Sequence, residues 1–341
     1  MLKSKFDQFL AFIKNKNILI TTHDLVDIDG LVSCLTLKYL LTLINCEFLN
    51  SKNPEISIYF SELSKSTKNF IKNFNNIFPE FDFSYEEQFD LTNIEILIIV
   101  DTNKLNQIKI DDEIDVSNIN IPYIFIDHHY YGLTPEERNE NWLDLVSQDY
   151  SSTSEIILEL VEFYKKTLTI PLKNLIISAI LTDSGFFKHG NNKSIQNVSN
   201  LLCEEIKIQD IYQILQNEID ISEKIAKIKG LQRVELIKAG EFLIGLTNVS
   251  SFGASVASIL LKLGFDIGIV ISKEKNHYII NTRAKKAVCL KSGLNLGKIL
   301  EEISLLYNGS GGGHDGAASL TINNEYENIL QEIIEKVKLF L

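Results

Sequence analysis

Apolar runs rich in β-branched residues recur through the first half of the sequence, and each is followed by a polar segment, in places with a helical pattern. The runs are NILITT from Asn17, ISIYF from Ile56, EILIIV from Glu95 and PYIFI from Pro122. Short, near-continuous apolar runs are typical of parallel strands that are covered on both faces. The pattern therefore predicts an α/β fold, with a doubly wound, mostly parallel sheet over residues 1–200.

The second half of the chain predicts a smaller α/β domain. A charged helical pattern without strand signals covers residues 201–229 and suggests a linker helix region. Residues 230–341 then show a hairpin, a helix, two further strands, another helix, a glycine cluster, a short strand and a final helix. We expect the active site in the cleft between the two domains.

Charge and cysteine content limit the classes of partner. The 45 acidic and 33 basic residues leave a net charge of -12, which disfavours binding of long nucleic acids. The four cysteines are too far apart for a zinc ribbon and suggest buried, reduced thiols. Because no uninterrupted apolar run reaches the roughly 18 residues of a membrane span and the N-terminus lacks a signal-peptide pattern, we expect a cytoplasmic protein without a membrane partner.

Acidic and histidine side chains follow the predicted strands at their carboxyl ends, where open α/β sheets bind ligands. The candidates are His23, Asp27, Asp29, Asp101, Asp127, His128 and His129, with Asp183 at the end of a predicted helix. Carboxylates this dense raise one another's pKa unless cations separate them. Oxygen and nitrogen donors without thiolates favour manganese, with magnesium, cobalt or iron as alternatives, and the number of donors suits two divalent ions.

Each of these residues also has an ordinary structural explanation. Asp29 precedes a glycine and a predicted helix, where an acid commonly caps the helix. Asp101 could end a strand in a turn, and Asp183 could stabilise the turn made with Gly185. Adjacent histidines could simply lie in a surface loop. The coincidence of position at the strand ends favours a shared ligand site over these separate explanations.

A glycine-rich segment near the C-terminus, GSGGGH from Gly309, is a second candidate site. Successive glycines can turn their amide N–H groups toward one point and form an anion-binding nest. A flexible glycine hinge is the alternative. His314 adds a donor at this segment, and Arg283 supplies a planar fork of donors that suits phosphate.

These segments resemble, in order, the motifs of the DHH phosphoesterases and of their DHH-associated C-terminal domain. Each motif is weak singly, but the ordered set covers nearly the whole chain. The matching segments are HDLVDIDG from His23, VDT from Val100, DHH from Asp127, SSTSE from Ser151, TDSG from Thr182, NTRAK from Asn281 and GSGGGHDGAAS from Gly309. Val26 departs from the pattern, because many members carry proline there; we expect this to alter loop stiffness and not metal binding.

The resemblance implies a role for each matching residue. One metal ion would be held by His23, Asp27 and Asp101, and a second by Asp29, Asp101, His128 and Asp183, so that Asp101 bridges the two. Asp127 would orient one of the two histidines that follow it, and His129 would contact the phosphate or the leaving oxygen. The substrate-binding residues would be Arg283, Gly311, Gly312, Gly313 and His314.

The activity implied by the resemblance is hydrolysis of cyclic di-AMP or its short linear relatives, by attack on phosphorus of a hydroxide that bridges two metal ions. Two alternatives within the family are trimming of very short RNA from the 5′ end and dephosphorylation of 3′-phosphoadenosine 5′-phosphate. An inorganic pyrophosphatase shares the metal motifs but carries a different C-terminal domain. A nucleotide sensor without turnover is the alternative outside enzymes, and a homodimer fits the family.

Overall fold

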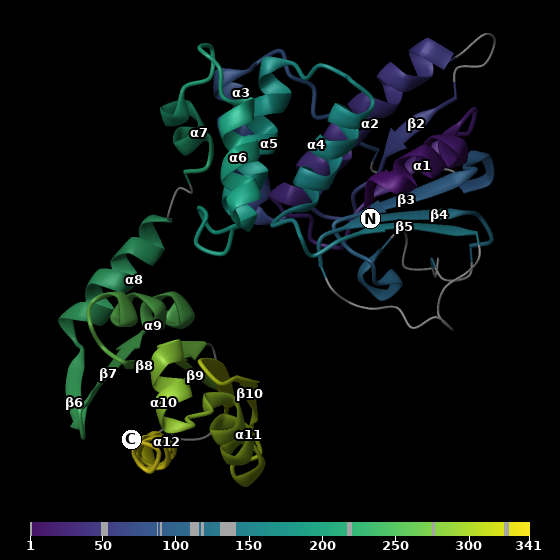
Figure 1. Cartoon of the computed structure of the whole chain (residues 1–341). Helices are drawn as coiled ribbons and strands as arrows, with labels where there is room; N and C mark the ends of the chain where they lie inside the picture. The colour runs from purple at the N-terminus through teal and green to yellow at the C-terminus, as the bar shows by residue number, and fades with distance from the viewer. Residues whose placement is uncertain are drawn as a thin grey trace. The chain divides into compact units, whose positions relative to one another are not determined.

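The computed structural model describes residues 2–48, 54–86, 88, 91–109, 116, 119–129, 141–216, 220–274, 277–323 and 327–341. Its contacts divide the chain into two compact units, Met1–Glu218 and Ile219–Leu341 (Figure 1). Each unit holds one sheet with its own hydrophobic core. We therefore describe the two units separately.

The sheet of the first unit is parallel throughout, in the order β2-β1-β3-β4-β5. Its strands are β1 (Ile18–Thr21), β2 (Ile56–Ile58), β3 (Ile96–Val100), β4 (Tyr123–Asp127) and β5 (Trp142–Val146). Every residue of β1, β3 and β4 is buried, as their continuous apolar sequences predict. The α/β fold expected from the sequence is confirmed. The edge strand β5 was not predicted, because its residues alternate between buried and half-buried along WLDLV.

Helices and 3₁₀ turns surround this sheet, and α2 packs against both α4 and α5. The helices are α1 (Phe6–Ile13), α2 (Ile28–Phe48), α3 (Lys65–Ile77), α4 (Thr153–Phe163), α5 (Ile170–Asp183), α6 (Asn192–Leu201) and α7 (Ile208–Ile214), and the 3₁₀ turns are η1 (Leu2–Lys5), η2 (Leu91–Asn93) and η3 (Leu105–Gln107). The segment Ile28–Asn45 of α2 is long and apolar enough, by length and composition, to cross a membrane. It is 72% buried inside the protein, and an all-round apolar helix in that position is a core helix.

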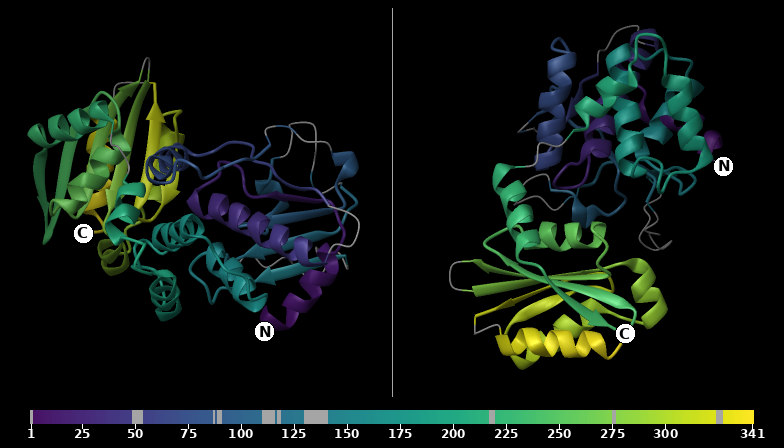
Figure 2. Two further views of the ribbon diagram at one scale, coloured as in Figure 1. Left: turned by 90° about the horizontal axis from the view of Figure 1, so that it is seen from above. Right: turned by 90° about the vertical axis from the view of Figure 1, so that its left-hand side faces the viewer.

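The second unit contains a mixed sheet in the order β10-β11-β9-β8-β7-β6, with β7 and β8 parallel and the other neighbours antiparallel. Helices cover it on both faces: α8 and α9 pack around Val270, and α10 to α12 pack around Ile269 (Figure 2). Its elements are α8 (Ile221–Gln232), β6 (Glu235–Ala239), β7 (Phe242–Val249), α9 (Gly253–Lys262), β8 (Ile267–Glu274), β9 (His277–Ala284), α10 (Lys286–Ser292), α11 (Leu296–Leu306), β10 (Ser310–His314), β11 (Ala317–Ile322) and α12 (Glu327–Lys338).

The region expected to link the two domains contains two helices, α7 and α8, which belong to different units. Helix α7 packs against α3 and α5, whereas α8 packs against α9 and β7. The charged sequence pattern of this region arises because one side of each helix is exposed. Ile211 and Ile214 on the other side of α7, and Ala226 on that of α8, are buried.

The glycine-rich segment differs from the sequence-based expectation. Gly311, Gly312 and Gly313 lie in strand β10, paired with β11, and of the three only Gly313 has a positive φ, of 147°. The anion-binding nest predicted here is therefore wrong, because a nest needs successive residues of alternating helical conformation. The glycines permit close packing instead. A Cβ on Gly311 would lie 2.7 Å from the carbonyl oxygen of Leu300 in α11, and a Cβ on Gly313 would lie 2.3 Å from the carbonyl oxygen of Ala317.

Candidate metal centre

The carboxyl ends of three neighbouring strands and the ends of three helices meet at one place in the first unit. His23 follows β1, Asp101 follows β3, and Asp127 ends β4 just before the two histidines. Asp29 lies in the first turn of α2, and Asp183 is the last residue of α5. The structure thus brings together the candidates from the first half of the sequence, as the topology of a parallel sheet dictates.

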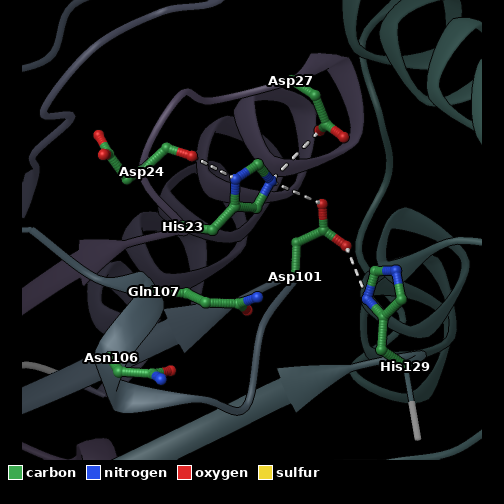
Figure 3. Close-up of a pocket in the computed structure, with 7 residues that line it drawn as sticks. All are labelled: His23, Asp24, Asp27, Asp101, Asn106, Gln107 and His129. Atoms are coloured by element: carbon green, nitrogen blue, oxygen red, sulfur yellow. Dashed lines mark hydrogen bonds and ion pairs between the residues drawn. The ribbon is translucent and has the colours of Figure 1, made fainter. Parts of the chain in front are cut away.

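The first group of possible metal ligands consists of His23, Asp27 and Asp101 (Figure 3). Nδ1 of His23 lies 2.8 Å from the Asp24 carbonyl oxygen, which can only accept, so Nδ1 carries the hydrogen. Nε2 then faces the acids, 3.8 Å from Oδ1 of Asp27 and 3.7 Å from Oδ2 of Asp101. A histidine held this way through one ring nitrogen presents the other as a ligand.

The second group consists of Asp29, His128 and Asp183, whose donor atoms all lie within 4.8 Å of one another. Nε2 of His128 is 3.0 Å from Oδ2 of Asp183 and 3.7 Å from Oδ1 of Asp101. Asp101 therefore contacts both groups, through Oδ2 on the His23 side and Oδ1 on the His128 side. This is the position that a bridging carboxylate would occupy.

Burial makes this collection of acids unfavourable without a cation. Asp29 and Asp101 are almost fully buried, and burial raises the pKa of Asp101 to about 6. Burial, reinforced by the charges of Asp101 and Asp183, also raises the pKa of Asp29 well above its usual range. Burial lowers the pKa of His23, but its contacts with Asp101 and Asp27 outweigh burial and raise that pKa to about 11. A divalent cation would relieve this repulsion.

The donor atoms themselves fit a divalent metal ion. Nε2 of His128 is buried, and its near neighbour among the described residues is Oδ2 of Asp183, an ion-pair contact at 3.0 Å. A buried imidazole nitrogen among carboxylate oxygens, without thiolates, suits hard or borderline divalent ions.

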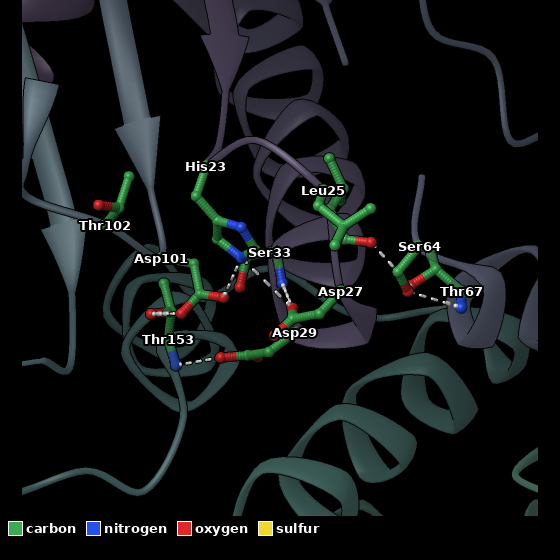
Figure 4. A network of polar contacts seen from close by, with 12 residues as sticks. His23, Leu25, Asp27, Asp29, Ser33, Ser64, Thr67, Asp101, Thr102 and Thr153 are labelled. Atoms are coloured by element: carbon green, nitrogen blue, oxygen red, sulfur yellow. Dashed lines mark hydrogen bonds and ion pairs between the residues drawn. The ribbon is translucent and has the colours of Figure 1, made fainter. Parts of the chain in front are cut away.

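The N-terminus of α4 supports both groups, and sequence reasoning missed this. The amide of Thr153 donates to Oδ2 of Asp29 at 2.6 Å, and the Thr153 hydroxyl donates to Oδ1 of Asp101 at 2.9 Å (Figure 4). The amide of Ser154 donates to the other carboxylate oxygen of Asp29 at 3.1 Å. The first amides of a helix have no partner within it, so they are available to hold a carboxylate. The sequence signal for these contacts was the SSTSE segment from Ser151, in which α4 begins.

Asp27 takes over the capping role considered for Asp29. Its Oδ1 accepts from the amide of Gly30 at 3.0 Å, in the first turn of α2. Asp29, inside the same helix, is left to bind the amides of α4. The capping explanation of Asp29 is therefore wrong, and the helix start is stabilised by its neighbour two residues earlier.

The fully buried Asp127 orients His129. Its Oδ1 accepts from the amide of His129 at 3.0 Å and lies 2.9 Å from Nδ1 of the same ring. Asn103 also donates to the carbonyl oxygen of His129, at 3.1 Å. The contact with Asp127 raises the pKa of His129. Of the two histidines considered in the sequence, the ring that Asp127 holds is thus the second.

The loop before α2 is held by hydrogen bonds from the neighbouring segment 62–67. The amide of Val26 donates to the Glu62 carbonyl oxygen at 2.7 Å. The carbonyl oxygen of Val26 accepts from the amide of Ser64 at 3.0 Å and from the hydroxyl of Thr67 at 2.8 Å. A proline could not donate the first of these bonds. The departure at Val26 therefore adds an anchor to the loop that carries His23 and Asp27.

A pocket of about 410 Å³ opens beside the first ligand group (Figure 3). Its lining includes Asn106 and Gln107 of η3, which the sequence analysis did not single out, together with His23, Asp24, Asp27, Asp101 and His129. The amide of Asp24 donates to the Gln107 carbonyl oxygen at 2.7 Å, and this bond joins η3 to the loop after β1. Two carboxamides therefore face the same space as the candidate ligands.

Arg283 and His314 lie on one face of the second sheet. Arg283 of β9 pairs with Ala317 of β11, which pairs in turn with His314 of β10. Directly paired residues point to the same face, two strand spacings or about 10 Å apart. The two predicted substrate contacts can therefore meet one ligand, whereas the cleft expected between the units stays a prediction.

Comparison with known proteins places both halves of the chain. Residues 17–182 match the N-terminal domain of the DHH family, and residues 247–341 match the DHHA1 domain. The chain belongs to the DHH phosphoesterase family with a C-terminal DHHA1 domain. It is thus a phosphoesterase-type hydrolase of a family whose members are metal-dependent phosphoesterases and nucleases.

Individual relatives are similar to this chain over nearly its whole length. An uncharacterized protein of Methanocaldococcus jannaschii is 28% identical over 339 residues, which cover 97% of this chain and 94% of the relative. An exopolyphosphatase-related protein from Bacteroides fragilis shares the fold, with a TM-score of 0.60, 17% identity and coverage of 99% of this chain and 98% of that one. A structure of exonuclease RecJ bound to manganese matches with a TM-score of 0.47 and 10% identity, over 99% of this chain and 94% of that one.

Proposed function

We propose that this DHH protein is a two-metal phosphodiesterase that hydrolyses cyclic di-AMP, its linear product pApA and other short oligonucleotides. The observation that carries the proposal is the convergence of two ligand groups on the shared carboxylate of Asp101. The family supplies the reaction class, and the pocket beside the ligands supplies a place for a small substrate.

In this proposal, His23, Asp27 and Asp101 hold one divalent ion, and Asp29, His128 and Asp183 hold a second together with Asp101. Two such ions, of which manganese suits the donors best, would activate water and neutralise charge that develops on the phosphoryl group. The amides of Thr153 and Ser154 keep Asp29 in place, and the Thr153 hydroxyl keeps Asp101 in place. The protein thus fixes the ligands before the substrate arrives.

The remaining residues are assigned to the substrate. His129, with a side chain 40% exposed and a ring oriented by buried Asp127, donates to a phosphate oxygen at the edge of the pocket. Asn106 and Gln107 bind polar groups of the nucleotide from the opposite wall. In the second unit, Arg283 and His314, which lie on one face of the sheet, bind a second phosphate.

The charge of the chain favours a short substrate over a polymer. A net charge of -12 repels a long phosphate backbone, and each phosphate contact must be supplied locally. The pocket of about 410 Å³ has the size of a small-molecule site. Both observations support a dinucleotide or a very short oligonucleotide.

The experiment incubates the purified full chain with Mn²⁺ and, separately, with cyclic di-AMP, pApA, short RNA, 3′-phosphoadenosine 5′-phosphate and pyrophosphate. We expect release of AMP from pApA and linearisation of cyclic di-AMP, both abolished in the Asp101→Asn variant. Asp82→Asn is the matched control, because Asp82 is an exposed acid in the loop after α3. Hydrolysis of pyrophosphate alone, or of none of the five, would overturn the proposal.

A further inference from the structure

The loop that follows Asp183 has an unusual backbone. Phe186 and Phe187 both adopt left-handed conformations, with φ of 56° and 66°. Bulky residues rarely enter this region, because the side chain strains the backbone there. Hydrogen bonds hold the loop in this form: the amide of Phe186 donates to the Leu181 carbonyl oxygen at 2.6 Å, and that of His189 donates to the Ser184 carbonyl oxygen at 2.8 Å.

This conformation places an aromatic ring on the surface. Phe187 packs against the core of the first unit, whereas Phe186 is 49% exposed. The Phe186 ring stacks against that of Tyr212 from α7, which is 55% exposed, with centroids 5.9 Å apart and planes within 2° of parallel. An offset stack of this kind keeps both rings in one orientation. The two residues form an ordered aromatic step, which we call the Phe186–Tyr212 pair.

Through Phe186, the Phe186–Tyr212 pair is close, along the chain, to one of the candidate metal ligands. Phe186 is three residues from Asp183, so their Cα atoms are at most about 11 Å apart. Lys188 and His189, in the same loop, are also exposed. An exposed aromatic ring, a cation and an imidazole therefore occur in one loop, which directly follows a candidate metal ligand.

We propose that the Phe186–Tyr212 pair is a stacking platform for a nucleobase of the substrate. The inference rests on the proposed function, since it assigns a part of the same substrate. Every base has a π-face, and stacking on an aromatic side chain contributes about 1–3 kcal/mol per base with little sequence preference. The strained backbone fits this role, because it holds an aromatic ring at the surface in the loop that follows Asp183.

The test is calorimetric binding of AMP and of ribose 5-phosphate to the full chain with saturating Mn²⁺. The two ligands share phosphate and sugar and differ in the base. We expect AMP to bind about 5- to 150-fold more tightly than ribose 5-phosphate, which is the stacking energy converted to affinity. Phe186→Leu should remove most of this difference without weakening ribose 5-phosphate, and Phe186→Trp should restore it.

Two further variants separate the platform from a general effect of aromatic loss. Tyr212→Leu removes the ring that orients Phe186, and it should lower the affinity for AMP less than Phe186→Leu does. Phe340→Leu, at a 43% exposed phenylalanine near the C-terminus, should change nothing. Equal affinity of the wild type for both ligands, no binding of either, or unchanged AMP binding in Phe186→Leu would overturn the inference. Hydrolysis of pApA is measured separately, so failure of the proposed activity and failure of the proposed base stacking can be distinguished.

Discussion

The replacement Thr153→Val tests whether the start of α4 supports the metal centre. Thr153 is fully buried, and its hydroxyl donates to Oδ1 of Asp101 at 2.9 Å. Valine keeps the shape of the side chain and the backbone amide that binds Asp29, so the variant removes this one hydrogen bond. It also puts a methyl group against a buried carboxylate.

The expected magnitude follows from the charge of the acceptor. A hydrogen bond to a charged group contributes about 1.5–3 kcal/mol to stability, and loss of the donor leaves the Asp101 oxygen without that partner. We therefore expect the free energy of unfolding of the metal-free variant to fall by about 1.5–3 kcal/mol. Because outer hydrogen bonds orient metal ligands, affinity for Mn²⁺ should fall by about 10- to 100-fold.

Urea denaturation in the presence of a chelator measures the first quantity, and titration of the stripped protein with Mn²⁺ measures the second. Thr153→Ser is the matched control, since it keeps the hydroxyl and removes only a methyl group. Serine should retain Mn²⁺ affinity close to that of the wild type. A valine variant that loses stability but binds Mn²⁺ normally would refute the claim that this contact positions Asp101 for a metal.

Three other substitutions have expected outcomes in unfolding experiments. Val26→Pro removes the donor to Glu62 and should lower the free energy of unfolding by about 1–3 kcal/mol, whereas Val26→Ile should have a smaller effect. Gly30→Ala should also destabilise, against the usual helical preference for alanine, because the new Cβ would lie 2.7 Å from Oγ1 of Thr22; a stabilised variant would contradict this packing. Phe186→Asn should raise the free energy of unfolding by about 1 kcal/mol while AMP affinity falls; a loss of both would indicate a structural role.

The sequence predicted those parts of the fold that local patterns determine. Continuous apolar runs marked β1, β3 and β4, and the acids and histidines that follow them marked the candidate centre. The edge strand β5 was not predicted because only one of its faces is buried. Leu143 and Leu145 therefore give only a weak, short alternation of apolar and polar residues. Its place is set by pairing with β4, which is a long-range contact.

The misinterpretations arose where a residue type serves more than one purpose. Glycines suggested an anion nest, but Gly311 is required by the approach of α11 to strand β10. The role of Thr153 could not be predicted from its own position, because its hydroxyl acts on Asp101, which lies 52 residues earlier in the chain. Asn106 is likewise an ordinary polar residue until the fold places it in the pocket wall. Such roles are properties of tertiary contacts and are absent from local sequence patterns.

The most direct test of the metal centre is an anomalous-difference map from crystals of the full chain grown with Mn²⁺. We expect two manganese peaks, one among His23, Asp27 and Asp101 and the other among Asp29, His128 and Asp183, with the Asp101 carboxylate between them. Manganese bound away from these residues, or a single ion that leaves one group without metal at saturating Mn²⁺, would contradict this expectation.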